Sequence, residues 1–394
     1  MHHLTTIADC KGEKSWMLSE FQATEERDLF GRSLLHLALD LGIGDDATHL
    51  LSTPVSIRDV DIWSRHPLHI ASSTGSINIV IRLIGGNANL ELADCDGFRA
   101  LHYASAAGHE DIVRLLVDKA KIDPPDRIGR TPLSHGARKG HITVVSLLLE
   151  KGANIESQDN NGFTPLSYGA RNGHIAVVSL LLEKGANIES QDEDGCTPLS
   201  LGVMNGNTAV VSLLLEKGAD IESQGNDGWT PLLHAIDSGS MAVIELLLKN
   251  GASARPLFEA RGYIMAGFSE RHLGILKLLL KPGVFAENDP LSMQKLISAY
   301  GVAALSYASE LGELEVVAKL LEEKLDPNRE AWRREPPLCY AVRARNTEIV
   351  EILLAHGADP NLSSAEGRTA VSIAAEQGDK NLVQKLRDAG RFYL

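Results

Sequence analysis

Cysteine, basic charge and long apolar runs are all scarce in this chain, and each shortage excludes a class of protein. The four cysteines lie far apart in 394 residues and include no CxxC pair, so neither a disulfide framework nor a zinc site is indicated, and a reducing compartment is expected. The 38 basic residues are outnumbered by 52 acidic ones, and the resulting net charge of -14 repels nucleic-acid phosphates and anionic membranes. No apolar run approaches the length that spans a bilayer.

Catalytic and targeting motifs are also missing. The strings HExxH, GxSxG and GxxxxGK[ST] are absent, and the carboxylate pair Asp45-Asp46 stands alone in what we interpret as a solvated turn. The segment MHHLTTIADCKGEKSW lacks the basic and apolar stretches of a secretory signal. We therefore predict a protein that is not an enzyme, holds no cofactor or metal, and lies in the cytoplasm, with the nucleus as the alternative.

What the chain does have is a 33-residue internal period. The segment ARKGHITVVSLLLEKGANIESQD, which starts at Ala137, returns almost unchanged at Ala170, and a weaker third copy ends at Gln224. One position of this frame holds histidine in three repeats and serine in the next three (His36, His69, His102, Ser134, Ser167 and Ser200). A histidine that recurs at one repeat position is interpreted as structural.

The stretch DNNGFTPLSYGARNGHIAVVSLLLEKGANIE closely resembles the repeat pattern of ankyrin proteins, and the resemblance covers about nine-tenths of the chain. It implies an all-α repeat solenoid of ankyrin helix-turn-helix repeats with projecting β-hairpin loops. We expect 11 repeats. They follow a partial helical cap (1–27) and comprise repeats 1–7 (28–250), an irregular repeat 8 with an insertion (251–303), and repeats 9–11 with a C-terminal cap (304–394).

The local sequence supports these helices independently. Thr164 offers a hydroxyl cap followed by Pro165 at the first helical position, and Gly173 can end that helix with a positive φ. The second helix carries an apolar face that only neighbouring repeats can bury (Ile175, Val178, Leu181 and Leu182). Where serine replaces the histidine usual in the family, we expect a local hydrogen bond instead of a bridge between loops.

The period is broken between repeats 8 and 9. The leucine pair moves from Leu279-Leu280 to Leu320-Leu321, a step of 41 that exceeds 33 by eight. This excess predicts a protruding loop with a short helix in residues 282–301. A tolerated surface insertion is the simpler interpretation, and a partner site or a hinge is the alternative.

In ankyrin proteins the hairpins and first helices line a concave binding groove, and the resemblance implies the same surface here. Basic residues gather on it in repeats 4 and 5 and acidic residues in repeats 6 and 7. The candidate partner-binding residues are Arg127, Arg130, Arg138, Lys139, Phe163, Arg171, Glu193, Asp194 and Trp229. The two aromatic residues either anchor the partner or pack on neighbouring hairpins.

The favoured hypothesis is a non-catalytic scaffold or adaptor that binds a protein or peptide segment of mixed charge in this groove, because matching charge steers the encounter and sets the register. A monomer without nucleic-acid or membrane partners is expected. The alternative is a sensor or regulatory ankyrin segment of a larger signalling or enzymatic protein, since near-identical repeats 4 to 6 suggest recent duplication. A third hypothesis, an enzyme acting through the groove, has no motif in its favour.

Overall fold

The computed structural model describes residues 27–41, 58–253, 273–274, 277, 290–329 and 335–391, with the backbone alone for Leu34 and residues 290–299. Within these ranges the chain forms 19 helices and no β-strand, and an isolated bridge joins Ser363 to Thr369. The expected all-α repeat architecture is thus confirmed, although its hairpins are closed loops without strands. The chain divides into two compact units, residues 1–228 and 229–394. The predicted cap lies outside the described residues, apart from Arg27.

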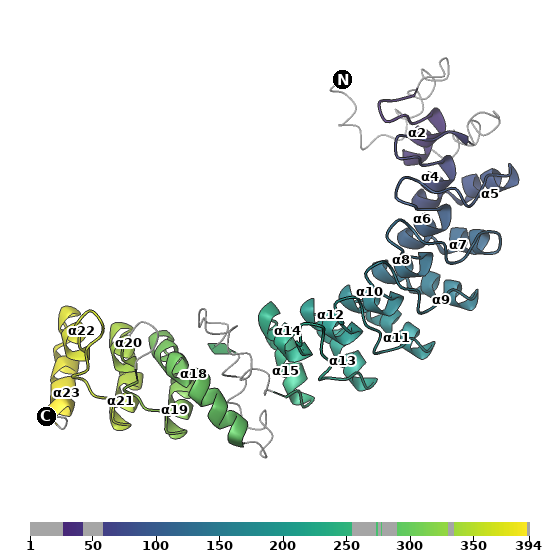
Figure 1. Ribbon diagram of the computed structural model, residues 1–394. Coiled ribbons are helices and arrows are strands. Elements are labelled where there is room, and N and C mark those ends of the chain that lie inside the picture. The colour runs from purple at the N-terminus through teal and green to yellow at the C-terminus, as the bar shows by residue number, and fades with distance from the viewer. Residues whose placement is uncertain are drawn as a thin grey trace. The chain divides into compact units, whose positions relative to one another are not determined.

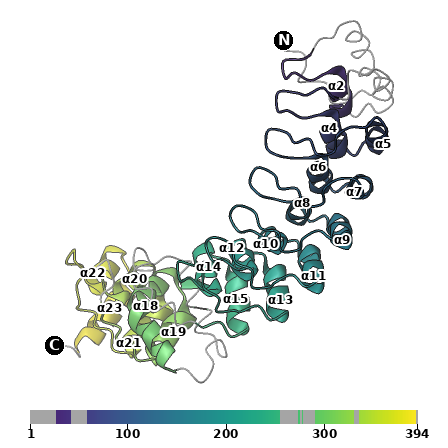
Figure 2. The ribbon, with the colours of Figure 1, turned by 45° about the vertical axis from the view of Figure 1, so that its right-hand side comes forward.

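In the first unit, helix pairs stack so that first helices pack on first helices and second helices on second helices (Figure 1). The first helices are α2 (Leu34–Asp40), α4 (Pro67–Thr74), α6 (Ala100–Ala107), α8 (Pro132–Lys139), α10 (Pro165–Arg171) and α12 (Pro198–Met204). The second helices are α5 (Ile77–Gly85), α7 (Glu110–Val117), α9 (Ile142–Glu150), α11 (Ile175–Glu183) and α13 (Thr208–Glu216). Hairpin loops extend from the row of first helices, on the side away from the second helices (Figure 2).

Repeat 5 shows how the local sequence begins and ends these helices. Thr164 is the N-cap of α10, and its hydroxyl accepts a hydrogen bond from the Ser167 amide at 3.2 Å. Pro165 takes the first helical position, where an amide would have no helical partner. Gly173, with φ of 77°, adopts the left-handed conformation that turns the chain toward α11. The predicted start and stop signals are confirmed.

The core lies between the paired helices and between successive repeats. In α11, Val177, Val178 and Leu181 are fully buried. The prediction that Ile175 belongs to this face is wrong, because its side chain is 45% exposed, while Leu182 is half-buried. Two residues correspond to about 200° around a helix, so Ile175 points away from the side that Val177 buries.

The second unit contains the remaining helix pairs. They are α14 (Pro231–Ser238) with α15 (Met241–Lys249), α18 (Pro290–Leu311) with α19 (Leu314–Glu322), α20 (Pro337–Arg343) with α21 (Thr347–Ala355), and α22 (Ala370–Glu376) with α23 (Lys380–Gly390). Helix α20 packs against both α18 and α22, and α19 packs against α21. Repeats 9 to 11 therefore repeat the stacking pattern of the first unit.

The helix expected inside the insertion is longer than predicted. Residues 290–311 form one continuous helix of 22 residues, which runs from the insertion into the first helix of repeat 9. Pro290 stands at its start, and Gly312, with φ of 83°, follows its last residue. No further proline interrupts this stretch, so a helix that has begun propagates to the glycine. Residues 282–289 of the predicted loop lie outside the described residues.

Imidazole groups join the first three repeats to the chain that follows. The Nε2 atoms lie 2.9 to 3.2 Å from backbone carbonyl oxygens (His36 to Arg65, His69 to Leu92, His102 to Arg130). The Nδ1 atom of each ring accepts a hydrogen bond from the N-cap amide, so Nε2 carries the proton and the ring is neutral. Burial of these rings lowers the pKa of His69 to about 4 and that of His102 to about 3.

Hydroxyl groups replace the imidazole in repeats 4 to 6. Thr164 Oγ1 lies 3.0 Å from Ser167 Oγ and 3.2 Å from Ser190 Oγ, which belongs to the segment leading into the next repeat. The same trio of one threonine and two serines recurs in the repeats before and after. The serine does bond locally, as predicted, and a third hydroxyl restores the link between repeats.

Candidate protein-interaction surface

One aspartate organises each hairpin of repeats 1 to 6. Asp159 Oδ1 accepts hydrogen bonds from the amides of Asn161 and Phe163, both at 2.9 Å, and Oδ2 accepts one from the Tyr168 hydroxyl at 2.5 Å. Gly162, with φ of 78°, completes the turn. The same pair of amide bonds holds the hairpins of Asp28, Asp61, Asp94, Asp126 and Asp192. A carboxylate bonded in this way shapes the loop without a strand ladder.

Backbone hydrogen bonds join each hairpin tip to the next. The Arg127 amide donates to the Asp96 carbonyl at 2.8 Å, and the Glu193 amide donates to the Asn161 carbonyl at 2.9 Å. Equivalent bonds run from Ile62 to Phe30, Cys95 to Trp63, Asn160 to Ile128 and Asn226 to Asp194. Side chains at the tips therefore stand on a fixed backbone, which reduces the ordering cost when a partner binds.

The two arginines of the repeat 4 hairpin have different roles. Arg130 Nε pairs with Asp126 Oδ2 at 2.9 Å, and only 15% of the Arg130 side chain is exposed. His135 Nε2 lies 2.9 Å from the same oxygen. Burial opposes ionisation of Asp126, but the bonds from His135 and Arg130 outweigh it and lower the pKa of Asp126 to about 2. Arg130 thus holds its own hairpin, whereas Arg127 is exposed and forms no ion pair within the described residues.

Arg138, Lys139 and Arg171 lie in the last turns of α8 and α10, which pack directly on each other. Arg138 and Arg171 hold the same repeat position, so the structure places them on adjacent helix ends. Lys139 and Arg171 are exposed, Arg138 is half-buried, and no carboxylate of the described chain pairs with any of them. Cations here also stabilise the helices, because they face the negative end of the helix dipole.

The two predicted aromatic anchors make ring contacts within their own repeats. Phe163 is half-buried, with its ring centroid 5.4 Å from that of Tyr168 and 5.4 Å from the Arg171 guanidinium carbon. Trp229 is half-buried beside His234, at 5.2 Å between ring centroids, and belongs to the second unit. Phe163 is therefore the predicted anchor that shares a unit with the charged residues.

The predicted acidic residues lie at the tip of the repeat 6 hairpin. Glu193 and Asp194 are both exposed, and their carbonyl oxygens accept hydrogen bonds from Asn226 at 2.8 Å. Their carboxylates form no ion pair in the described part of the chain. Basic groups in repeats 4 and 5 and acidic groups in repeat 6 thus follow one another along the hairpin side of the first unit.

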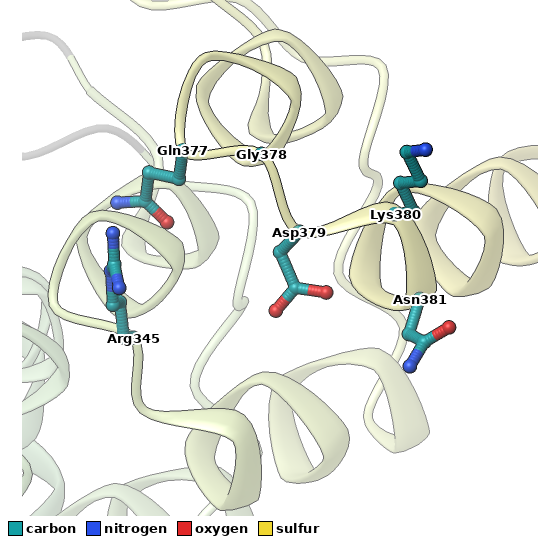
Figure 3. A pocket seen from close by; sticks show the side chains of 6 residues that line it. All are labelled: Arg345, Gln377, Gly378, Asp379, Lys380 and Asn381. Atoms are coloured by element: carbon teal, nitrogen blue, oxygen red, sulfur yellow. The ribbon is translucent and has the colours of Figure 1, made fainter.

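A hollow in the second unit escaped the sequence analysis. It has a volume of about 440 Å³ and is lined by Arg345, Gln377, Gly378, Asp379, Lys380 and Asn381 (Figure 3). Arg345 takes a left-handed φ of 59° at the position that is Gly312 one repeat earlier and Gly378 one repeat later. The repeat frame could have flagged this substitution, because arginine is unusual in that conformation. Gln377 bonds the Arg343 carbonyl at 3.0 Å and Asp379 caps α23, so both serve the fold.

The described residues hold no group of three or more histidine, cysteine, aspartate or glutamate side chains placed to bind a metal ion. Nor does any helix among them combine the length and apolarity needed to cross a membrane.

Comparison with known proteins places these features in a family. The family model for ankyrin repeats matches residues 35–128, 121–192, 186–256 and 305–392, which is well over half of the chain, and residues 257–304 lie outside the matches. A putative ankyrin repeat protein of Rickettsia bellii (strain RML369-C) is 33% identical over 89 residues, which are 21% of this chain and 53% of that protein. The chain therefore spans about half the length of this relative.

Two further relatives show where such repeats occur. The cyclin-dependent kinase 4 inhibitor B of Bos taurus is 36% identical over 92 residues, covering 23% of this chain and 69% of the inhibitor. The transient receptor potential cation channel subfamily A member 1 of Homo sapiens is 35% identical over 92 residues, covering 23% of this chain and 8% of the channel. With its helix pairs, its hairpins and these matches, the chain belongs to the ankyrin-repeat family, whose repeats are generally protein-interaction modules and typically non-catalytic.

Proposed function

We propose that the chain is a non-catalytic scaffold or adaptor that binds a protein or peptide segment of mixed charge along the hairpins and first helices of repeats 4 to 6. The observation that supports this function most is the set of exposed charges without ion pairs there. Arg127 and Arg171 precede Glu193 and Asp194 along one unit of a chain whose net charge is -14.

The charge order defines the partner segment. An acidic stretch facing Arg127, Arg138 and Arg171, followed by a basic stretch facing Glu193 and Asp194, matches the surface in sign. Such complementarity raises the association rate and fixes the direction of the bound segment. A large apolar side chain of the partner beside Phe163 supplies the desolvated contact that slows dissociation. Trp229 lies in the second unit, and this proposal does not include it in the surface.

Binding kinetics test the proposal on a partner captured from the source cells. Replacing Arg138 and Arg171 with Glu should slow association and flatten its dependence on salt, whereas Phe163→Ala should speed dissociation by about tenfold or more. The matched control replaces Lys184 and Lys217, exposed C-cap residues of α11 and α13, with Glu. Unchanged kinetics in both test variants, with thermal stability retained, would move the partner site away from repeats 4 to 6.

A monomeric state and a cytoplasmic location, with the nucleus as the alternative, complete the proposal. Sedimentation velocity of the purified chain should give a single species of 42.5 kDa. A fluorescent fusion in the source cells distinguishes the two compartments.

The alternative is a sensor or regulatory ankyrin segment of a larger protein. The match to the human channel favours it, because 23% of this chain corresponds there to only 8% of a much longer protein. Sequencing the native transcript decides the matter, since a reading frame that continues beyond these 394 residues into an effector domain supports the regulatory role.

A further inference from the structure

The hairpin tips change in character along the first unit. The two residues after each hairpin aspartate are Leu29-Phe30 and Ile62-Trp63 in repeats 1 and 2, but Asn160-Asn161 and Glu193-Asp194 in repeats 5 and 6. The same backbone bonds support all of these tips, so the fold does not require apolar side chains at any of them. A contiguous apolar patch on the surface of a folded protein marks an interaction site.

Leu29, Phe30, Ile62 and Trp63 form this tip patch. Their side chains are 83%, 45%, 60% and 40% exposed, respectively. The Phe30 and Trp63 rings are stacked, with centroids 5.7 Å apart and planes 17° from parallel. The Ile62 amide donates a hydrogen bond to the Phe30 carbonyl at 3.0 Å, which joins the two tips. The patch is therefore preformed, and a partner need not order it.

Beside the tip patch the surface is hollowed and negatively charged. The hollow has a volume of about 260 Å³ and is lined by Trp63, Arg65, Asp94, Asp96 and Tyr103. The charge of Arg65 is compensated by Asp61, at 2.7 Å between Nε and Oδ2. Asp94 accepts a hydrogen bond from the Tyr103 hydroxyl at 2.5 Å, and neither Asp94 nor Asp96 has an ion pair within the described residues. Two uncompensated carboxylates thus stand next to an exposed indole ring.

We infer that the tip patch and this hollow together bind a segment of a partner protein in which large apolar side chains stand next to a lysine or arginine. The apolar side chains cover the tip patch, and the cation enters the hollow between Trp63 and the carboxylates of Asp94 and Asp96. Charge-assisted hydrogen bonds to these two carboxylates favour a cation there. The Trp63 ring contributes apolar contact only, because it is stacked on Phe30 and the Arg65 guanidinium carbon already lies 4.8 Å from its centroid.

The charges of the surface also separate this occupant from others. A second copy of the surface supplies no cation, because Arg32 is already bonded to Asp28 and Arg65 to Asp61, both at 2.7 Å. An acidic segment would bring further negative charge to Asp94 and Asp96. The surface lies in repeats 1 to 3, apart from the one proposed at repeats 4 to 6, and its occupancy does not depend on that proposal.

Peptide selection on the full chain tests this inference. A random peptide library displayed on phage is selected on the immobilised chain, and one selected peptide is synthesised with a fluorescent label for anisotropy measurements. The selected sequences should combine large apolar residues with lysine or arginine. Trp63→Ala should weaken the Kd of the labelled peptide by about tenfold or more, while Trp63→Phe should keep most of the affinity. Asp96→Lys should also weaken binding, and a peptide with its basic residue changed to glutamate should bind that variant better than the original peptide does.

Matched variants keep the test independent of folding and of the other surface. Asp194→Lys makes the same change at the same hairpin position three repeats further on and should leave the Kd unchanged. The Arg138→Glu, Arg171→Glu double variant should leave it unchanged as well. Selected peptides without basic residues, or equal affinity for the parent and Trp63→Ala, would overturn the inference. The inference also fails if the chain is a dimer that Ile62→Asp dissociates, because the tip patch would then be covered by a second copy. It fails equally if peptides bind only after removal of residues 1–24, because the chain's own N-terminal segment would then occupy the tip patch.

Discussion

Repeats 1 to 3 and repeats 4 to 6 share one backbone arrangement but join their neighbours with different polar groups. In the former, one imidazole ring reaches both the N-cap amide and a carbonyl oxygen of the following segment, as His102 does between Arg99 and Arg130. In the latter, a threonine and two serines are needed, because a hydroxyl is too short to reach both groups. The comparison teaches that the repeat frame requires a polar link rather than a particular residue.

The choice of link has a chemical consequence. A histidine that is buried and neutral in the folded chain binds a proton at mildly acidic pH once the chain unfolds, whereas hydroxyl groups do not titrate there in either state. Two halves of one unit with the same fold should therefore differ in their response to acid.

Acid should produce the largest difference between the two regions. As the pH falls, histidines of the unfolded chain bind protons near pH 6.5, while His69 stays neutral to about pH 4 and His102 to about pH 3 in the folded chain. The unfolded state then binds more protons, so the free energy of unfolding falls with pH, by about 1.4 kcal/mol per pH unit for each such histidine. Hydrogen exchange at pH 7 and pH 5, with labelling times scaled to the intrinsic rates, should show residues 60–125 losing protection before residues 159–224.

Repeat 4 is left out of that comparison because it contains both kinds of group. His135 is buried there and bonded to Asp126, and burial is the main reason that the pKa of His135 is lowered. A uniform loss of protection across repeats 2 to 6 would contradict the assignment of acid sensitivity to the buried imidazoles.

Truncation at the shared position should give the next largest difference. His102→Ala leaves the Arg99 amide and the Arg130 carbonyl without their partner and opens a cavity at a fully buried site, so we expect a cost of about 2–4 kcal/mol. Ser167→Ala, equally buried in repeat 5, removes a smaller group and leaves the Thr164 hydroxyl bonded to Ser190, at a cost of about 1 kcal/mol. Urea unfolding of the full chain measures both costs. Equal costs would show that the imidazole link contributes no more to stability than the hydroxyl link does.

Much of the fold could be predicted from the sequence because its signals are local. The cap at Thr164, the proline after it and the left-handed Gly173 each act within a few residues, and the 33-residue period repeats them. The length of α18 was not predicted, because the local signals around the insertion do not show that one helix continues into repeat 9. Gly301, the last residue of the predicted insertion, lies inside α18 and does not stop the helix, and the break in the period alone does not locate the helix start.

The candidate surface was less predictable, because a charge in the sequence does not reveal whether the fold uses it. Arg130 was expected to face a partner, yet it pairs with Asp126 four residues earlier. Phe163 packs on Tyr168 and under Arg171, which depends on the turn geometry rather than on spacing. The sequence contains Ile62 and Trp63 side by side, but only the structure shows that Trp63 stacks on Phe30 and lines a hollow.

Coupling within one hydroxyl trio should be a smaller effect. Thr164→Ala removes the cap of α10 and should cost about 1 kcal/mol. Ser190→Ala should cost less, because among the contacts that the structure describes the Ser190 hydroxyl bonds only to Thr164. The double variant should then cost less than the sum of the two by about 0.5–1 kcal/mol, since the shared bond is lost only once. A double-mutant cycle in urea measures this, and strict additivity would mean that the hydroxyl link between repeats contributes nothing.

The smallest expected effect concerns the pH dependence of the cost of Thr164→Ala, which should be close to zero. This result distinguishes the hydroxyl link from the imidazole link. The cost of Thr164→Ala should stay constant within about 0.3 kcal/mol between pH 7 and pH 5, because none of the three hydroxyls titrates. The pKa of nearby Asp192 is raised by burial, but that carboxylate bonds the amides of Asp194 and Cys196 and titrates alike in parent and variant. The cost of His102→Ala should instead shrink as the pH falls, because the variant no longer contains the imidazole whose protonation favours the unfolded chain. Urea unfolding of both variants and the parent at the two pH values makes the comparison, and a cost of Thr164→Ala that changes as steeply as that of His102→Ala would trace the acid response to groups outside the links.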